Sequence, residues 1–216
     1  MPDLAQPLLD SPALPSLVER LQRTLADEAA ARERFFETLD PECKAEFING
    51  ESIMASPARD AHNAAVGRLA QLLGAYVQVQ GLGIVRSEKA LVALTRNDYE
   101  PDVCVFGVEK AASIEASTLR YPAPDLAIEV LSPKTEQRDR GIKFEDYAAH
   151  GVDEYWIVDA EHETVEQYLN ADGTYELAMK SGTGLLESRA VEGFSVLVRA
   201  VFDDDANLAA LREILA

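Results

Sequence analysis

Residues 124–159 constrain the fold most, because they predict a strand, a turn, a helix and a second strand in close succession. Apolar residues alternate with others over residues 125–131, as in a strand whose successive side chains point to opposite faces. Pro133 ends that strand, since proline cannot donate to a β ladder. A helix over residues 139–150 and an apolar strand over residues 154–158 follow. This succession predicts a β-α-β crossover with a parallel pair of strands.

Glu129 is the residue that an apolar strand explains least well. It lies between Ile128 and Val130, on a strand that we expect to be buried. A buried ionised carboxylate is costly unless it is paired or binds a metal. Two interpretations are therefore open: a structural carboxylate bonded to a nearby Lys or Arg, or an acid that holds a divalent cation.

The charge of the chain narrows the classes of function. Its 216 residues suffice for one sizeable domain with some additions, and the formal net charge is −18. A protein that binds nucleic acid by neutralising phosphates is expected to carry a basic face. The acidic total argues against tight nonspecific DNA binding but is compatible with a local basic groove. Acidic clusters are also typical of divalent-metal sites or of a self-repelling surface.

The sequence favours a cytoplasmic protein without a membrane span. Its apolar runs fall short of the roughly 20 residues that cross a bilayer. The first residues lack the basic start of a signal peptide. Cys43 and Cys104 lie far apart and form neither a disulfide framework nor a CxxC motif. A reducing compartment is therefore expected.

Residue patterns predict the other elements of the chain. We expect a loose arm over residues 1–15, then a helix over residues 17–39 that packs on the main body or on a second subunit. The Asn49-Gly50 dipeptide predicts a hairpin, because both positions tolerate positive φ. The remaining predictions are a helix over residues 59–79, strands over 84–87, 90–94 and from Asp102 onward, a turn at Asn97-Asp98, a hairpin over 164–179, a strand over 194–198 and a helix over 207–215.

Three residues suit a metal-dependent reaction on a phosphodiester. Asp102 begins a strand, Glu129 lies within the next buried strand, and Lys143 lies on the helix that follows. Two carboxylates on neighbouring strands can share one Mg²⁺ ion, and the backbone carbonyl of Val130 is a further candidate ligand. Such an ion activates water and polarises a phosphodiester oxygen, and Lys143 would orient that water or offset developing charge. The alternative for Asp102 is a turn-forming role, and a lone His62 in a first helical turn is more often a surface or capping residue.

The segments PDVCVF, PDLAIEVLSP and GIKFEDYAAHGVDEYWIVD together resemble the restriction endonucleases of the Uma-two type, within the PD-(D/E)XK nuclease superfamily. The hairpin segment AEFINGE, followed by His62, resembles the N-terminal block of that family. The likeness spans residues 45–168. It implies an α/β (α+β), restriction-endonuclease-like core: a central mixed β-sheet flanked by helices, with an N-terminal helical extension. We therefore divide the chain into residues 1–40, an arm and helix, and residues 41–216, the nuclease-like domain.

The resemblance also implies a metal-dependent site, with Mg²⁺ or Mn²⁺ as cofactor. Asp102 matches the first acidic position of the family and Glu129 the second. Glu46 and His62 match positions beside the site, where Glu46 is a candidate additional ligand. Asp125 is a weaker candidate, because four residues along a strand separate it from Glu129 by more than about 10 Å.

One departure from the superfamily pattern concerns its lysine. The pattern places a lysine two residues after Glu129, where this chain has Leu131. Related sequences move the lysine to the following helix, and Lys143 matches it there. Activity therefore depends on Lys143 reaching inward.

Three functions stay open at this point. The first is a Mg²⁺-dependent DNA endonuclease, expected as a homodimer because duplex DNA has two strands to cut. The second is a catalytically inactive binding or assembly protein on the same fold, since fold does not fix function. The third is a nuclease for RNA or single-stranded DNA. Clustering of Asp102, Glu129 and Lys143 beside a basic strip would favour an enzyme, and a solvent-facing Lys143 would favour the inactive protein.

Overall fold

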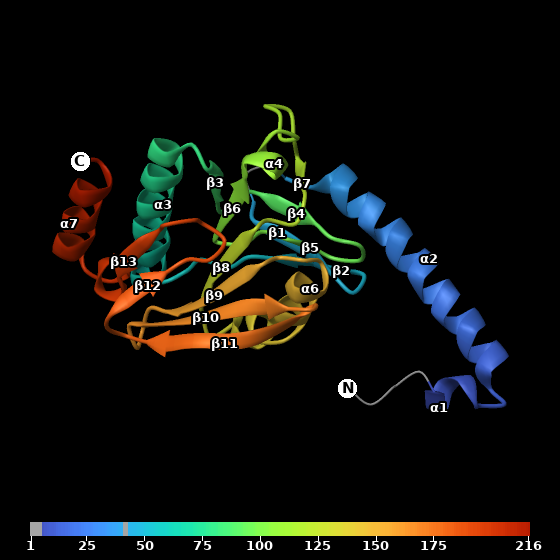
Figure 1. Ribbon diagram of the computed structural model, residues 1–216. Helices are drawn as coiled ribbons and strands as arrows, with labels where there is room; N and C mark the ends of the chain where they lie inside the picture. Colours follow the sequence, from blue (N-terminus) through green and yellow to red (C-terminus); the bar gives the residue numbers. More distant parts are fainter. Residues whose placement is uncertain (1–5, 41–42) are drawn as a thin grey trace.

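The computed structural model describes residues 6–40 and 43–216 and has a mixed α/β fold (Figure 1). Its largest sheet has six strands in the order β11-β10-β9-β8-β6-β3, with helices α3 and α6 packed on opposite faces. The predicted fold class, a mixed sheet flanked by helices, is confirmed. These elements are β3 (Gly83–Ser87), β6 (Val103–Gly107), β8 (Leu126–Val130), β9 (Glu154–Asp159), β10 (Thr164–Ala171), β11 (Thr174–Ser181), α3 (Asp60–Gln80) and α6 (Ile142–Ala149).

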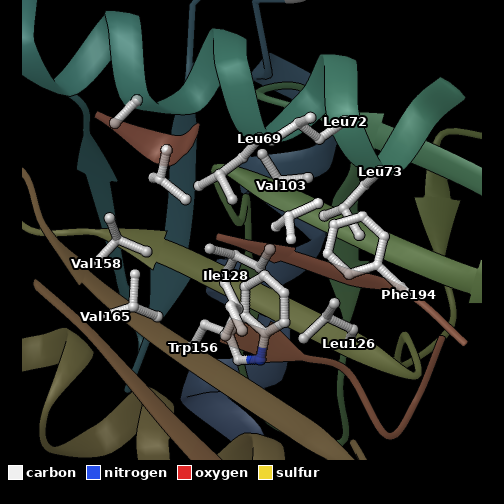
Figure 2. Close-up of a cluster of buried hydrophobic side chains, with 14 of the residues drawn as sticks. Leu69, Leu72, Leu73, Val103, Leu126, Ile128, Trp156, Val158, Val165 and Phe194 are labelled. Carbon is white, nitrogen blue, oxygen red and sulfur yellow. The ribbon is translucent and has the colours of Figure 1, made fainter. Parts of the chain in front are cut away.

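Strand β8 is buried along its whole length, because both faces of the central sheet are covered. Ile128 packs with Leu69 of α3 and with Trp156 and Phe194 in one core (Figure 2). On the other face, Ala127 packs in a second core with Tyr147 of α6. Alternation along β8 thus sorts side chains between two cores rather than between core and solvent.

The predicted crossover is confirmed, since β8 and β9 pair in parallel. The single helix predicted over residues 139–150 is wrong at its start. A short helix, α5 (Glu136–Asp139), precedes α6, and the two are separated at Gly141. A Cβ atom at Gly141 would lie 2.7 Å from the carbonyl oxygen of Gln137, so the close approach of the two helices requires glycine there.

A second sheet of five strands carries the predicted hairpin. Its strands follow the order β2-β1-β5-β4-β7. The Asn49-Gly50 turn is confirmed, with φ of 51° and 88°. The turn predicted at Asn97-Asp98 is wrong, because Asp98 belongs to a strand and the bend falls at Thr95 and Arg96. The strands are β1 (Ala45–Ile48), β2 (Glu51–Met54), β4 (Leu91–Ala93), β5 (Asp98–Tyr99) and β7 (Arg120–Tyr121).

Helix α2 (Leu14–Thr38) docks on this second sheet by its C-terminal half. The Arg32 guanidinium donates two hydrogen bonds of 2.6 Å to the Asp98 carboxylate, and Phe35 packs against Phe47. The other half projects from the body of the molecule (Figure 1). The loose arm predicted over residues 1–15 is wrong in part, because α1 (Gln6–Leu9) is helical and α2 begins at Leu14, where Pro15 is tolerated in a first turn. Residues 1–5 of that prediction lie outside the described residues.

The C-terminal part closes one side of the central sheet. Helix α7 begins before its predicted start at residue 207, because the Asp203 carboxylate caps it by accepting a hydrogen bond from the Ala206 N–H at 2.9 Å. Among the described helices, none is both long and apolar enough to cross a bilayer. The remaining elements are α4 (Val108–Ala111), β12 (Leu185–Glu187), β13 (Ser195–Leu197), a 3₁₀ helix (Val198–Val201) and α7 (Asp204–Ile214).

Candidate functional site

Asp102 lies directly before β6, whose predicted start at Asp102 is one residue early, and is next to Glu129 of β8. Strands β6 and β8 are antiparallel, with Val103 opposite Ile128. Extending this register by one residue sets Asp102 opposite Glu129, so that both side chains point to the same face of the sheet. The Val130 N–H donates a hydrogen bond of 2.8 Å to Oδ2 of Asp102, and both acids are buried. The carboxylate of Asp102 is therefore held in place by the backbone of the strand that carries Glu129.

Lys143 reaches this pair from helix α6. Its Nζ atom lies 2.7 Å from Oε1 of Glu46, 3.0 Å from Oε1 of Glu129 and 3.3 Å from Oδ1 of Asp139. Only 3% of the Lys143 side chain is exposed. Glu46 belongs to β1 in the second sheet, so the ammonium joins the two sheets. The break at Gly141 places both Asp139 and Lys143 inside, one at the end of α5 and the other near the start of α6.

Burial and crowding shift the pKa of these groups. Burial raises the pKa of Glu129 well above its usual value, and Asp139, Asp102 and Glu46 add to this while Lys143 opposes it. Burial by itself would lower the pKa of Lys143, but the surrounding carboxylates raise it well above its usual value. Burial also raises the pKa of Asp139, whose two carboxylate oxygens accept no hydrogen bond from the described part of the chain. On this side of the site, three carboxylates thus share one cation, the Lys143 ammonium.

A second lysine lies on the other side of Asp102. The Nζ atom of Lys44 is 2.5 Å from Oδ1 of Asp102 and 3.4 Å from Oε2 of Glu88. His62 is close as well, with Nε2 3.7 Å from the same Oδ1 atom. Nδ1 of His62 is buried and makes no hydrogen bond to any described residue.

Sequence reasoning missed Lys44 and Glu88. A signal for Lys44 existed, because it lies two residues before Glu46 and neighbours at that spacing share one side of an extended strand. Glu88 follows β3 with a φ of 66°, and its N–H donates to the Asp102 carbonyl at 3.1 Å. Nothing in the local sequence indicated that this acid would face Asp102.

One pocket of about 510 Å³ is lined by most of the residues singled out from the sequence. Basic side chains also line it, although the chain as a whole is acidic. The structure therefore brings the candidate residues except Asp125 to one place, while their chemical roles stay predictions. The lining includes the candidates Glu46, His62, Asp102, Glu129, Val130 and Lys143, together with Lys44, Arg59, Glu88, Lys134 and Arg138.

The donor set suits a divalent cation. His62, Glu88 and Asp102 each offer one ligand atom, and these atoms lie within 4.8 Å of one another. Carboxylate oxygens suit Mg²⁺ and Mn²⁺, and an imidazole nitrogen suits transition ions. Glu129 is outside this group, and its Oε1 instead accepts from Lys143 and from the Tyr147 hydroxyl, at 3.0 and 3.3 Å. The expected ligand roles of Glu129 and of the Val130 carbonyl stay predictions.

Asp125, the weaker candidate, serves another part of the fold. Its Oδ2 accepts a hydrogen bond of 2.6 Å from the Gly107 N–H, and its Oδ1 lies 2.7 Å from Nζ of Lys110. These contacts hold the start of α4 beside the N-terminal end of β8. Glu129 lies toward the opposite end of that strand.

The mixed sheet, its flanking helices and the pocket of acidic and basic side chains are those of a restriction-endonuclease-like fold. The chain belongs to the Uma2 family, described as "putative restriction endonuclease", whose model matches residues 32–200. The resemblance seen in the sequence is thereby confirmed. A solved structure, a "putative nuclease belonging to DUF820" from Anabaena variabilis, has 19% sequence identity and a TM-score of 0.68, over 83% of this chain and 97% of that one. At this identity the likeness shows the shared fold. No curated protein matches the chain.

Proposed function

We propose that this protein is a Mg²⁺-dependent endonuclease that hydrolyses DNA phosphodiester bonds, with Mn²⁺ as a substitute ion. The observation that carries the proposal is the meeting in one pocket of Asp102, just before β6, Glu129 of β8 and Lys143 of α6. Lys143 is buried among acids rather than turned to solvent, which supports an enzyme over an inactive protein of the same fold. Membership in a family of restriction-endonuclease-like nucleases supports the same choice.

Each residue of the pocket has its own proposed role in hydrolysis. A bound divalent ion would polarise a phosphodiester oxygen and lower the pKa of a coordinated water. Asp102 would hold the ion, with the Val130 N–H fixing its second oxygen. Glu129 and Glu46 keep Lys143 charged and oriented. The ammonium of Lys143 would offset negative charge that develops on the phosphate or orient the attacking water.

The basic side chains of the pocket suit a nucleic-acid backbone. Arg59, Lys134 and Arg138 line it in a chain whose net charge is −18. Nε of Arg138 is buried and has no hydrogen-bond acceptor among the residues that the structure describes. A guanidinium can donate two parallel hydrogen bonds to a phosphate, so Arg138 is our candidate contact to the DNA strand.

We also propose a cytoplasmic homodimer in which helix α2 forms the subunit contact. The projecting half of α2 exposes Leu21 and Leu25, which are 51% and 54% exposed. The division of the chain into an arm and helix (residues 1–40) and a nuclease-like domain (residues 41–216) also stays a prediction. Light scattering on the purified protein should give twice the chain mass, and the double variant Leu21→Asp, Leu25→Asp should give a monomer. A wild-type monomer at micromolar concentration would contradict the dimer.

Nicking of supercoiled plasmid tests the activity directly. With Mg²⁺ or Mn²⁺ we expect the wild type to convert supercoiled to open-circular DNA, and EDTA to stop the reaction. Glu129→Gln should slow it by about 10²- to 10³-fold, the usual cost of losing one preorganised group. Glu145→Gln is the matched control, because Glu145 is exposed on the same helix as Lys143.

Single-stranded DNA and RNA of the same sequence, assayed in parallel, separate the proposed substrate from the alternatives. If single-stranded DNA or RNA is cleaved faster than duplex DNA, that nucleic acid is the preferred substrate. Equal nicking by wild type and Glu129→Gln would remove the proposed site. Binding of plasmid without cleavage of any substrate would favour the inactive binding protein.

A further inference from the structure

Two lysines of the site, Lys44 and Lys143, pair with five carboxylates, and the two lysines are held differently. The side chain of Lys143 is enclosed, with three acids around its ammonium. The side chain of Lys44 is 21% exposed, and among the described residues its ammonium pairs with two acids. Of the two lysines, Lys44 is therefore the one free to move. The five carboxylates belong to Glu46, Glu88, Asp102, Glu129 and Asp139.

The two acids that Lys44 contacts are the ones best placed for a metal. Asp102 and Glu88 supply two of the three ligand atoms that lie within 4.8 Å of one another. Nζ of Lys44 is 2.5 Å from Oδ1 of Asp102, the same atom that His62 faces at 3.7 Å. The ammonium thus lies where a cation bound by these acids would also lie.

Lys44 and a divalent ion could not both contact the same oxygen of Asp102 without strong repulsion. Like charges about 4 Å apart repel by about 1 kcal/mol in bulk water and by several kcal/mol near a protein surface. The lysine stem is flexible and its ammonium rotates freely, and the pocket of about 510 Å³ offers it room. Displacement of Lys44 therefore relieves the conflict more readily than rearrangement of the buried acids.

We infer that Lys44 is a resident cation of the metal site, which neutralises Asp102 and Glu88 in the metal-free protein and gives way when a divalent ion binds. This inference rests on the proposed function, because it assumes that the ion binds at Asp102. The exchange keeps the acids from repelling one another before the ion arrives. It also leaves the displaced ammonium in the pocket, beside the position of a bound phosphate. The same competition weakens the apparent affinity for the ion.

Calorimetric titration with Mn²⁺ alone tests the exchange. Lys44→Met keeps an apolar stem and removes the charge, so we expect it to bind Mn²⁺ at least about tenfold more tightly than the wild type, about 1.4 kcal/mol. Lys134→Met is the matched control, because Lys134 lines the same pocket and is exposed, with no ion pair among the described residues. It removes the same charge at longer range, and we expect a change of less than about threefold.

Two further measurements show whether the gain in Mn²⁺ affinity arises at Asp102 and Glu88. Adding Glu88→Gln to Lys44→Met should abolish most of the gain in affinity. In EDTA, Lys44→Met should melt at a lower temperature than the wild type, since Asp102 and Glu88 then lack a cation, and Mn²⁺ should raise its Tm by more than it raises that of the wild type. Lys44→Gln serves for the same titration if the methionine variant does not fold.

The outcomes separate this inference from the proposed function. Equal affinities of Lys44→Met and Lys134→Met, with tight binding by the wild type, would overturn the exchange and leave the metal site standing. Weaker binding by Lys44→Met would overturn it as well. A wild type and variants that all fail to bind Mn²⁺ would overturn both the exchange and the metal-dependent function.

Discussion

Two buried glutamates on adjacent strands of one sheet show two different uses of a carboxylate. Glu129 lies in β8, and Glu154 begins β9, where it is opposite Leu126 in the parallel register. Both are excluded from solvent, at 3% and 0% exposure. Sequence pattern treats them alike, as acids in apolar strands, but their surroundings differ.

Glu154 is surrounded by neutral donors. Its Oε1 accepts from Trp156 Nε1 and Gln167 Nε2, both at 2.6 Å. Its Oε2 accepts from the Ser188 hydroxyl and from the N–H groups of Arg189 and Ala190, each at 2.8 Å. Such a carboxylate is fully satisfied. It ties β9 and β10 to the loop that follows β12, so its role is structural.

Glu129 has few donors and many acidic neighbours. Lys143 and Tyr147 donate to one of its oxygens, while burial, and then Asp139, Asp102 and Glu46, raise its pKa. Perturbed carboxylates that gather in a pocket are candidates for function, whereas satisfied ones hold the fold. The comparison teaches that burial of an acid says little until its donors are counted.

Removing the structural acid should have the largest effect on stability. Glu154→Leu removes the acceptor of the Trp156 indole, the Ser188 hydroxyl and two backbone N–H groups, each at a cost of about 1–3 kcal/mol where water cannot reach. Gln167 keeps its hydrogen bond to the Glu187 carbonyl. We expect a loss of about 5 kcal/mol in the free energy of unfolding, measured by urea denaturation. A loss below about 1 kcal/mol would break the contrast drawn here, since it would mean that the donors find water instead.

Removing the lysine of the site should have the next largest effect. Lys143→Met leaves Glu46, Glu129 and Asp139 without their shared cation, and breaking a buried pair in this way costs about 3–5 kcal/mol. We expect the double variant Lys143→Met, Glu129→Gln to recover part of this loss, because it also removes one of the stranded charges. A double variant less stable than Lys143→Met would show that Glu129 is as fully satisfied as Glu154.

Neutralising the functional acid should change stability little. In Glu129→Gln the amide oxygen can still accept from Lys143, which keeps Glu46 and Asp139 as ionic partners. We expect the free energy of unfolding to stay within about 1 kcal/mol of the wild type. If Glu129→Gln loses nicking activity but keeps its stability, Glu129 has a functional role that differs from the structural role of Glu154. A large loss of stability would instead give Glu129 a structural role like that of Glu154.

The smallest effect should be a change in pH dependence. Burial raises the pKa of Glu129 above the usual 4.5, so the folded protein keeps this proton to higher pH than the unfolded chain. The stability contributed by this group is complete below the unfolded pKa and is lost as the pH rises through the folded pKa. From about pH 4 to pH 8, Glu129→Gln should therefore gain stability relative to the wild type in urea unfolding. If the wild type instead gained stability relative to Glu129→Gln over this pH range, the Lys143 ammonium would affect the pKa of Glu129 more strongly than burial does.

Much of the scaffold followed from local signals in the sequence. Asn49-Gly50 predicted the hairpin because its backbone needs positive φ, and Pro133 marked the end of β8. The succession of strand, helix and strand over residues 124–159 predicted the crossover. The residue types at Asp102, Glu129 and Lys143, together with the family resemblance, named the candidate site. Each of these signals acts within a few residues, or repeats a motif, so it can be read without the fold.

Contacts between distant segments were decided only by the tertiary structure. Lys44 and Asp102 are 58 residues apart in the chain, and the ammonium reaches the carboxylate because β1 pairs with β5, just before Asp102. Glu154 resembles Glu129 in sequence, and the donors that make it structural include Gln167 of β10 and the loop of residues 188–190, which the fold packs beside it. An acid in a strand is visible in the sequence, but the donors and cations around it come from other elements, and strand pairing places them.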